Sequence, residues 1–276
     1  TIKSTLEKLD AILNRLIEKG RISKEKKEQI LKCIIVVDQI SEFSKAEFVI
    51  EAIIEDLEIK KTLFHSLSQV IMDDCILATN TSSLSITNLA SSAINPSRFL
   101  GVHFFNPAPL MPLVEVIPAL QTDDTVLENV ITMLNDWKKT PVIAKDTPGF
   151  IVNRIARPFY GEALRIYEEG IADFRSIDES LKQGGFRMGP FELMDFIGND
   201  VNYAVTKSVF EAFYFDPRYK PSFTQKQYAE AGWLGRKSGR GYYHYNADPV
   251  KVEKIDNAKA KDIFERILVM LINEAV

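Results

Sequence analysis

The stretch from residue 101 to residue 116, GVHFFNPAPLMPLVEV, places one histidine and one glutamate in two apolar runs. His103 directly follows the first run, and Glu115 lies twelve residues later inside the second. A neutral imidazole can accept a proton from an alcohol near neutral pH, and a carboxylate bonded to its other nitrogen fixes the tautomer and stabilises the imidazolium. The pair therefore indicates acid–base chemistry. The competing interpretation is a packed histidine of the core, the commoner role of a lone histidine after a strand.

Patterns of strands and helices alternate on both sides of this stretch. Residues 55–70 carry one apolar stripe and one charged face, which predicts an amphipathic helix, and a second helix is expected near residues 124–138. Two earlier helices are expected over residues 3–19 and from Ser23 to Lys32. Short apolar runs predict strands at residues 34–37, 48–51, 76–79, 99–104, 113–117 and 142–144. This alternation favours the α/β class, with a doubly wound, mainly parallel Rossmann-like sheet covered by helices on both faces.

The pattern changes at Pro148–Gly149, after which only helices are expected as far as about residue 214. We therefore predict a sheet domain over residues 1–147 and an all-α domain over residues 148–246. Residues 247–276 are interpreted as a linker and the possible start of a second helical repeat. The reason is that Glu265–Val276 echoes Asn153–Leu164, with Arg, Ile, Glu and Ala in step, although helical sequences can also match by chance.

The bulk composition excludes several classes of partner. A net charge of -4 gives no electrostatic reason to expect nucleic acid or an anionic membrane. No apolar run approaches the roughly 20 residues that cross a bilayer. Cys33 and Cys75 form no C-x-x-C motif and are interpreted as reduced core thiols, so we expect a cytoplasmic protein. His65 and His244 have no neighbours with metal-ligand spacing, and we expect no metal site.

Four segments resemble the 3-hydroxyacyl-CoA dehydrogenase family in order and spacing: Phe48–Glu55, Ala78–Leu84, Gly101–Glu115 and Asp146–Arg154. The resemblance continues through residues 188–193 and 235–239 and covers about residues 3–246. It implies an enzyme that uses NAD to oxidise an L-3-hydroxyacyl-CoA to the 3-oxoacyl-CoA. Residues 197–210 are most similar to the phenylacetate-degradation branch, which acts on 3-hydroxyadipyl-CoA.

The resemblance also implies roles for individual residues. His103 would be the general base and Glu115 its orienting partner, while Ser82 and Asn153 would hold the substrate oxygen. The implied NAD contacts are Glu55, Lys60, Ser82, Asn106 and Lys237. Lys8 and Arg15 fall near positions that resemble contacts to the CoA phosphates, together with Ser82 and Asn153 as substrate contacts. Without the resemblance, each of the lysines and Arg15 would be interpreted as a solvated surface charge.

Dinucleotide-binding domains normally begin with a strand, a G-x-G-x-x-G turn and a helix that receives the pyrophosphate, and this sequence has no such motif. We therefore expect the chain to start roughly 40 residues into the natural protein, about the length of the missing unit. We also expect residues 1–276 to bind NAD weakly. Two alternatives remain open: a non-catalytic acyl-CoA-binding protein that has lost NAD binding, and a related dehydrogenase that acts on a sugar acid.

Two expectations concern substrate and assembly. A dicarboxylyl-CoA substrate would need a cation near its distal carboxylate, for which the sequence offers Arg154, Arg157 and Arg187. Aromatic residues of the helical domain suggest a homodimer through that domain, with internal core as the competing interpretation: Phe159, Tyr160, Phe210, Phe213 and Tyr214.

Overall fold

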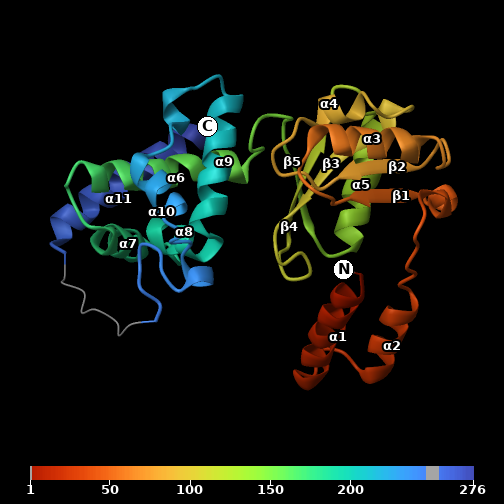
Figure 1. Ribbon diagram of the computed structural model, residues 1–276, viewed down its shortest axis with the longest axis horizontal. Helices are drawn as coiled ribbons and strands as arrows, with labels where there is room; N and C mark the ends of the chain where they lie inside the picture. The colour runs from red at the N-terminus through yellow and green to blue at the C-terminus, as the bar shows by residue number, and fades with distance from the viewer. Residues whose placement is uncertain (1, 247–254) are drawn as a thin grey trace.

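The computed structural model describes residues 2–246 and 255–276, and its first large unit is built on a five-stranded sheet (Figure 1). The strands lie in the order β1-β2-β3-β4-β5, which is also their order along the chain. They are β1 (Phe48–Glu51), β2 (Ile76–Thr79), β3 (Phe99–Phe104), β4 (Leu113–Pro118) and β5 (Thr140–Ile143). The predicted α/β class is confirmed, and each of these strands was predicted within about three residues at either end.

The sheet is mainly parallel, as expected, with one exception that matters for the site. Strands β1, β2 and β3 run parallel, β4 runs antiparallel to β3, and β5 runs parallel to β4. In the antiparallel pair, residues directly opposite each other present their side chains on the same face. The register pairs His103 with Glu115.

Helices cover both faces of the sheet. On one face, Phe64 and Leu67 from α3 (Leu57–Ser68) and Ile86 from α4 (Ile86–Ala90) pack on Phe99 and Ile117. The other face packs on α5 (Asp124–Asp136) through a separate apolar cluster: Ala78, Leu100, Val102, Val114, Val116, Val126, Val130 and Leu134. Because alternate strand residues point to opposite faces, His103 and Glu115 share the face of Phe99 and Ile117.

Gly101 permits the close approach of α4 to that face. A Cβ atom at this position would lie 2.8 Å from Cδ1 of Ile86 and 3.1 Å from Ile117. The helix therefore packs directly over the strand that carries His103.

The second unit consists of helices around its own apolar core (Figure 1). Its helices are α6 (Val152–Glu168), α7 (Phe174–Gln183), α8 (Pro190–Ile197), α9 (Asn199–Ala212), α10 (Phe223–Glu230) and α11 (Asn257–Ala275). Helix α11 packs against α6, whose sequence it echoes, and against α7. Residues 247–254 of the predicted linker lie outside the described residues, and the repeat remains a prediction.

The first two helices, α1 (Ile2–Glu18) and α2 (Lys24–Lys32), pair with each other apart from the sheet (Figure 1). Ser23 caps α2 as predicted, since its hydroxyl accepts from the Lys26 N–H. Single turns of 3-10 helix complete the described elements: η1 (Ile40–Lys45), η2 (Pro96–Arg98), η3 (Pro217–Tyr219) and η4 (Arg236–Ser238).

Two sequence predictions in this region are wrong. Residues 34–37 form no strand, and Ile35 is 82% exposed, because a β-branched run becomes a strand only where a neighbouring strand completes its hydrogen bonds. Cys33 is exposed rather than a core thiol, since it follows α2 on a surface that no other element covers closely, whereas Cys75 is buried as expected. None of the helices in residues 2–246 and 255–276 is long and apolar enough to span a bilayer.

Candidate active site

The centre of the candidate site is the contact between His103 and Glu115. Nδ1 of the imidazole lies 2.6 Å from Oε2 of Glu115, and both residues are buried, His103 being 7% exposed. Phe105 and Phe150 place their rings 4.7 Å and 5.8 Å from the imidazole. Because Glu115 accepts a hydrogen bond from Nδ1–H, Nε2 is left as the nitrogen that can accept a proton from a ligand.

The second oxygen of Glu115 binds the start of the helical unit. Oε1 accepts hydrogen bonds from the backbone N–H groups of Ile151, at 2.9 Å, and Val152, at 2.8 Å. The first N–H groups of a helix have no partner within the helix, and its N-terminus carries a partial positive charge. The carboxylate therefore bonds the start of a helix with one oxygen and the imidazole with the other.

Asn80 ties three strand ends into one rim. Its backbone N–H donates to the carbonyl of Glu51 at the end of β1, and its side-chain oxygen accepts from the N–H of Phe104 at the end of β3. Glu51, Asn80 and Phe104, the neighbour of His103, therefore meet at one edge of the sheet.

A buried cluster of charged side chains lies next to this rim. Glu51 accepts from Nζ of Lys60 at 2.5 Å and from the Thr79 hydroxyl at 2.6 Å, and Lys60 is only 1% exposed. Lys60 also lies 3.3 Å from Oε2 of Glu55. Its ammonium group therefore contacts the rim only through the carboxylates of Glu51 and Glu55 and is not itself exposed there.

Glu55 connects that cluster to the loop after β2. Its Oε1 accepts from the Thr81 hydroxyl and from the N–H of Ser82, and its side chain is 39% exposed. Partial burial pushes the pKa of Glu55 upward, but the hydrogen bonds from Thr81 and Ser82, with the nearby charge of Lys60, outweigh it and lower the pKa. Glu55 thus presents a charged acceptor beside Ser82.

Three further predicted residues border the His–Glu pair. Ser82 is half-buried in the loop after β2, and its hydroxyl makes no hydrogen bond with a described residue. Asn106 is exposed two residues beyond β3. Asn153 lies in the first turn of α6, next to Val152, whose N–H binds Glu115. Each can offer a polar group to a ligand that reaches Nε2 of His103.

The remaining predicted residues lie elsewhere in the fold. Lys237 is in the helical unit, where Nζ lies 2.5 Å from Oδ1 of Asp200 and 2.7 Å from Oδ2. Lys8 and Arg15 are exposed on α1. The strand ends beside His103 therefore also carry Ser82, Glu55 and Asn106, with Lys60 of α3 paired to Glu55, whereas these three cations lie on other elements.

Sequence reasoning missed two features of this site. The first is that the rings of Phe105 and Phe150 flank the imidazole, although both residues lie in segments that resemble the family. Asp146 was the other: its carboxylate accepts from the N–H groups of Ile86 and Thr87 and so fixes the chain between the two units to the start of α4. An acidic residue just before a domain boundary was the only available signal.

The rim suits one end of a dinucleotide better than the other. The exposed amide of Asn106, the free hydroxyl of Ser82 and the charged Glu55 can bind a nicotinamide and its ribose. For the pyrophosphate, the sequence has no glycine-rich turn after a strand. The residues present therefore fit the nicotinamide half. Among the described residues, no group of three or more His, Cys, Asp or Glu side chains could hold a metal ion.

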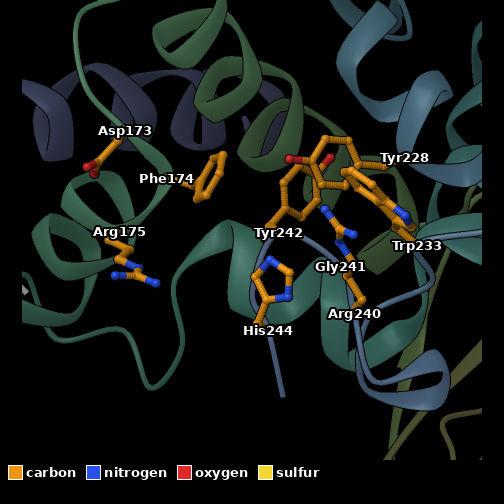
Figure 2. Close-up of a pocket in the computed structure, with 9 residues that line it drawn as sticks. All are labelled: Asp173, Phe174, Arg175, Tyr228, Trp233, Arg240, Gly241, Tyr242 and His244. Atoms are coloured by element: carbon orange, nitrogen blue, oxygen red, sulfur yellow. The ribbon is translucent and has the colours of Figure 1, made fainter. Parts of the chain in front are cut away.

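A separate cavity of about 300 Å³ lies in the helical unit (Figure 2). Figure 2 shows aromatic and cationic side chains around it, among them Tyr228, Trp233 and Arg240. The guanidinium of Arg240 stacks 3.5 Å from the centre of the Trp233 ring. None of the predicted catalytic or cofactor residues lines this cavity, so it is distinct from the His–Glu pair.

A sheet covered on both faces, with a buried histidine–glutamate pair at its strand ends and a helical unit bonded to the same carboxylate, defines an α/β protein of two units. Comparison with known families agrees. Residues 1–147 match the NAD binding domain of 3-hydroxyacyl-CoA dehydrogenase, and residues 149–245 match the C-terminal domain of the same family. The chain belongs to the 3-hydroxyacyl-CoA dehydrogenase family.

Individual relatives place the chain within that family. It is 45% identical over 265 residues to the 3-hydroxyadipyl-CoA dehydrogenase of Escherichia coli K12, covering 90% of this chain and 56% of that protein. It is 38% identical over 251 residues to a 3-hydroxybutyryl-CoA dehydrogenase of Bradyrhizobium diazoefficiens, covering 90% and 85%. The chain therefore spans little more than half the length of the first relative and most of the second.

Solved structures show the same fold. The crystal structure of a 3-hydroxybutyryl-CoA dehydrogenase from E. coli K12 superposes with a TM-score of 0.89 at 44% identity, over 93% of this chain and 55% of that one. The (S)-3-hydroxybutyryl-CoA dehydrogenase from Ralstonia eutropha gives 0.85 at 37% identity, over 89% and 87%. The predicted family and fold are confirmed.

Proposed function

We propose that this protein catalyses the NAD-dependent oxidation of an L-3-hydroxyacyl-CoA to the 3-oxoacyl-CoA, with His103 as the general base. The observation that carries the proposal is the 2.6 Å contact between Nδ1 of His103 and Glu115 at the carboxyl ends of the strands. A protein that only binds acyl-CoA has no need of a proton acceptor braced by a buried carboxylate. This favours catalysis over the acyl-CoA-binding alternative.

The bonding pattern defines the route of the proton. Nδ1–H donates to Glu115, so the lone pair of Nε2 accepts the proton of the substrate 3-hydroxyl. Bound NAD supplies the acceptor for the hydride that leaves C3. The imidazolium that forms would be stabilised by Glu115, which the N–H groups of Ile151 and Val152 hold in place. The carbonyl product results from loss of both the proton and the hydride.

The neighbouring polar residues would hold the two reactants. Ser82 and Asn153 would donate hydrogen bonds to the substrate oxygen, and Ser82, Asn106 and Glu55 would contact the nicotinamide half of NAD. Lys60 would act by keeping Glu55 charged and in place. Lys237 would contact the cofactor only if the helical unit brought it closer to the rim. Lys8 and Arg15 would contact the CoA phosphates only if α1 moved closer to the rim.

Further proposals concern assembly and location. We infer a sheet domain over residues 1–147 and a helical domain over residues 148–246, and a cytoplasmic homodimer through the helical domain.

Phe159 and Tyr160 are internal core rather than interface, but Tyr214 is 93% exposed and Phe215 is 64% exposed. Exposed aromatic side chains of this kind are typical of interfaces. Light scattering that reports the mass of one chain would contradict the dimer.

The test of the proposed function is stereospecific turnover. With NAD in excess, the protein should form NADH from L-3-hydroxybutyryl-CoA and not from the D isomer, because only one enantiomer would direct its hydroxyl to Nε2 of His103 and its C3 hydrogen to the nicotinamide at the same time. The control is the same assay without acyl-CoA. Binding of acetoacetyl-CoA without NADH formation from either isomer would favour the acyl-CoA-binding alternative.

A further inference from the structure

Arg157 is a buried cation one helical turn from a proposed substrate-binding residue. It lies on α6, is 5% exposed, and donates from Nε to the backbone carbonyl of Asn153 at 3.0 Å. Four residues of α-helix rise about 6 Å. The guanidinium is therefore close to the turn that holds Asn153.

No carboxylate neutralises this cation among the described residues. Nη1 donates to the carbonyl of Asn202 at 3.3 Å and to the hydroxyl of Thr206 at 3.0 Å, both neutral acceptors on α9. Nη2 makes no hydrogen bond with a described residue. Burial lowers the pKa of Arg157, opposed only by the phenol of Tyr160. An isolated buried charge is costly, so such groups are normally paired.

The two other arginines considered from the sequence differ on this point. Arg154 is paired with Glu274 of α11, and Arg187 is exposed. A paired cation has already been neutralised, and an exposed one is solvated. Arg157 is the one of the three that is buried and has no carboxylate partner among the described residues, although its guanidinium lies 5.0 Å from the centre of the Tyr160 ring.

The surroundings of Arg157 have spare hydrogen-bonding capacity. Gln225 donates to Oδ1 of Asn202 at 2.5 Å and to Thr206 at 3.1 Å, and all three are buried. Nδ2 of Asn202 and Oε1 of Gln225 are buried without a partner. A buried donor left unpaired costs free energy that a ligand oxygen would recover.

We propose that Arg157, assisted by Nδ2 of Asn202, binds the distal carboxylate of a six-carbon 3-hydroxydicarboxylyl-CoA. This inference rests on the proposed function. When Asn153 holds the C3 oxygen, three carbon–carbon bonds lead to the terminal carboxylate, a span of the same order as one helical turn. The bound carboxylate supplies the missing counter-charge, and the planar guanidinium offers it paired donors.

The test compares 3-hydroxyadipyl-CoA with 3-hydroxyhexanoyl-CoA, which has the same acyl length and no distal carboxylate. The wild type should favour the diacid in kcat/KM by roughly 10- to 100-fold, the usual value of a charge-assisted hydrogen bond. Arg157→Gln should abolish that ratio, because it should lower the value for 3-hydroxyadipyl-CoA far more than the value for 3-hydroxyhexanoyl-CoA. Arg165→Gln on the same helix, where Arg165 pairs with Glu162, is the matched control and should keep the ratio.

A second variant keeps the test independent of the folding of Arg157→Gln. Asn202→Asp places a carboxylate of almost the same shape in the cluster, so it should compete with the substrate and also lower the ratio. The proposal would be overturned if Arg157→Gln lowered kcat/KM equally for both substrates, or if Asn202→Asp left the ratio unchanged. It would also be overturned if the wild type showed no preference for the diacid.

Binding separates this inference from the proposed function. If neither substrate is oxidised, calorimetry with adipyl-CoA and hexanoyl-CoA gives the same comparison without turnover. Tighter binding of adipyl-CoA that is lost in Arg157→Gln would support the carboxylate site even though the oxidation had failed. Equal binding of both compounds would overturn it.

Discussion

Glu115 and Asp178 show the same local arrangement in the two units of the molecule. Each is a buried carboxylate that accepts from two consecutive backbone N–H groups at the start of a helix. Glu115 binds the chain entering α6, whereas Asp178 of α7 binds the N–H groups of Phe191 and Glu192 at the start of α8. Each also has one side-chain partner from a distant part of the sequence.

The chemistry of that last partner separates the two. Glu115 faces an imidazole, whose other nitrogen can exchange a proton, while Asp178 faces the hydroxyl of Tyr243 at 2.7 Å. Burial raises the pKa of Asp178 to about 7, against the hydrogen bonds from Tyr243, Phe191 and Glu192. Burial and the neighbouring carboxylate also raise the pKa of Tyr243. The same support for a helix start therefore belongs to the proposed catalytic pair in one unit and to packing in the other.

The largest expected effect is on His103. His103→Gln should lower kcat roughly 10²- to 10⁴-fold, because a positioned base contributes about that much and an amide cannot replace it. Steady-state NADH formation measures the change. His65→Gln, at an exposed histidine of α3, is the control, and a near-normal rate in His103→Gln would move the base elsewhere.

The next effect is on the bracing carboxylate. Glu115→Gln would place an amide N–H against Nδ1 and favour the tautomer whose Nε2 already carries a proton. We expect kcat to fall about 10²-fold, within the range of acid–base catalysis, with a displaced pH–rate profile. Glu128→Gln, at an exposed position of α5, should change neither quantity. A lower rate with the original profile would mean that Glu115 serves the fold alone.

Asp178→Ala tests the structural half of the comparison. It leaves the N–H groups of Phe191 and Glu192 without their acceptor, which should lower the free energy of unfolding by about 1–3 kcal/mol. Urea denaturation measures this, with Asp262→Ala on the exposed side of α11 as control. Equal stability of the two variants would show that the α7–α8 junction does not depend on this carboxylate.

The smallest expected effect is a gradual change of the free energy of unfolding with pH. The unfolded state loses the Asp178 proton near pH 3.8, whereas the folded state keeps it until about pH 7. The folded state therefore holds more protons between these values, and this group's contribution to stability falls as pH rises, by at most about 1.4 kcal/mol per pH unit. Denaturation of wild type and Asp178→Asn at pH 5 and pH 8 should show a steeper fall in the wild type. Parallel slopes would contradict the raised pKa.

The sequence was sufficient to predict the architecture because the apolar periodicities are strong. The bounds of β1 and β3 agree with the short buried runs at Phe48–Glu51 and Phe99–Phe104. Residues 34–37 are an equally short apolar run but remain outside the sheet. The difference is a neighbouring strand, which a local pattern does not reveal.

The candidate site was predictable in its members but not in its connections. Spacing identified His103 and Glu115, whereas the antiparallel register that sets them face to face is a property of the whole sheet. The bonds from Asn80 across three strand ends also depend on tertiary placement. The isolation of Arg157 could not be inferred, because finding a cation without a counter-charge requires knowing every group around it.

The backbone bonds to Oε1 of Glu115 have a mechanical consequence. Tilting α6 relative to the sheet would pull on the carboxylate, and the carboxylate would turn the imidazole with it. The junction between the sheet and α6 and the orientation of the His103 ring are thus mechanically coupled. Any movement of α6 away from the sheet would also change the position of the imidazole.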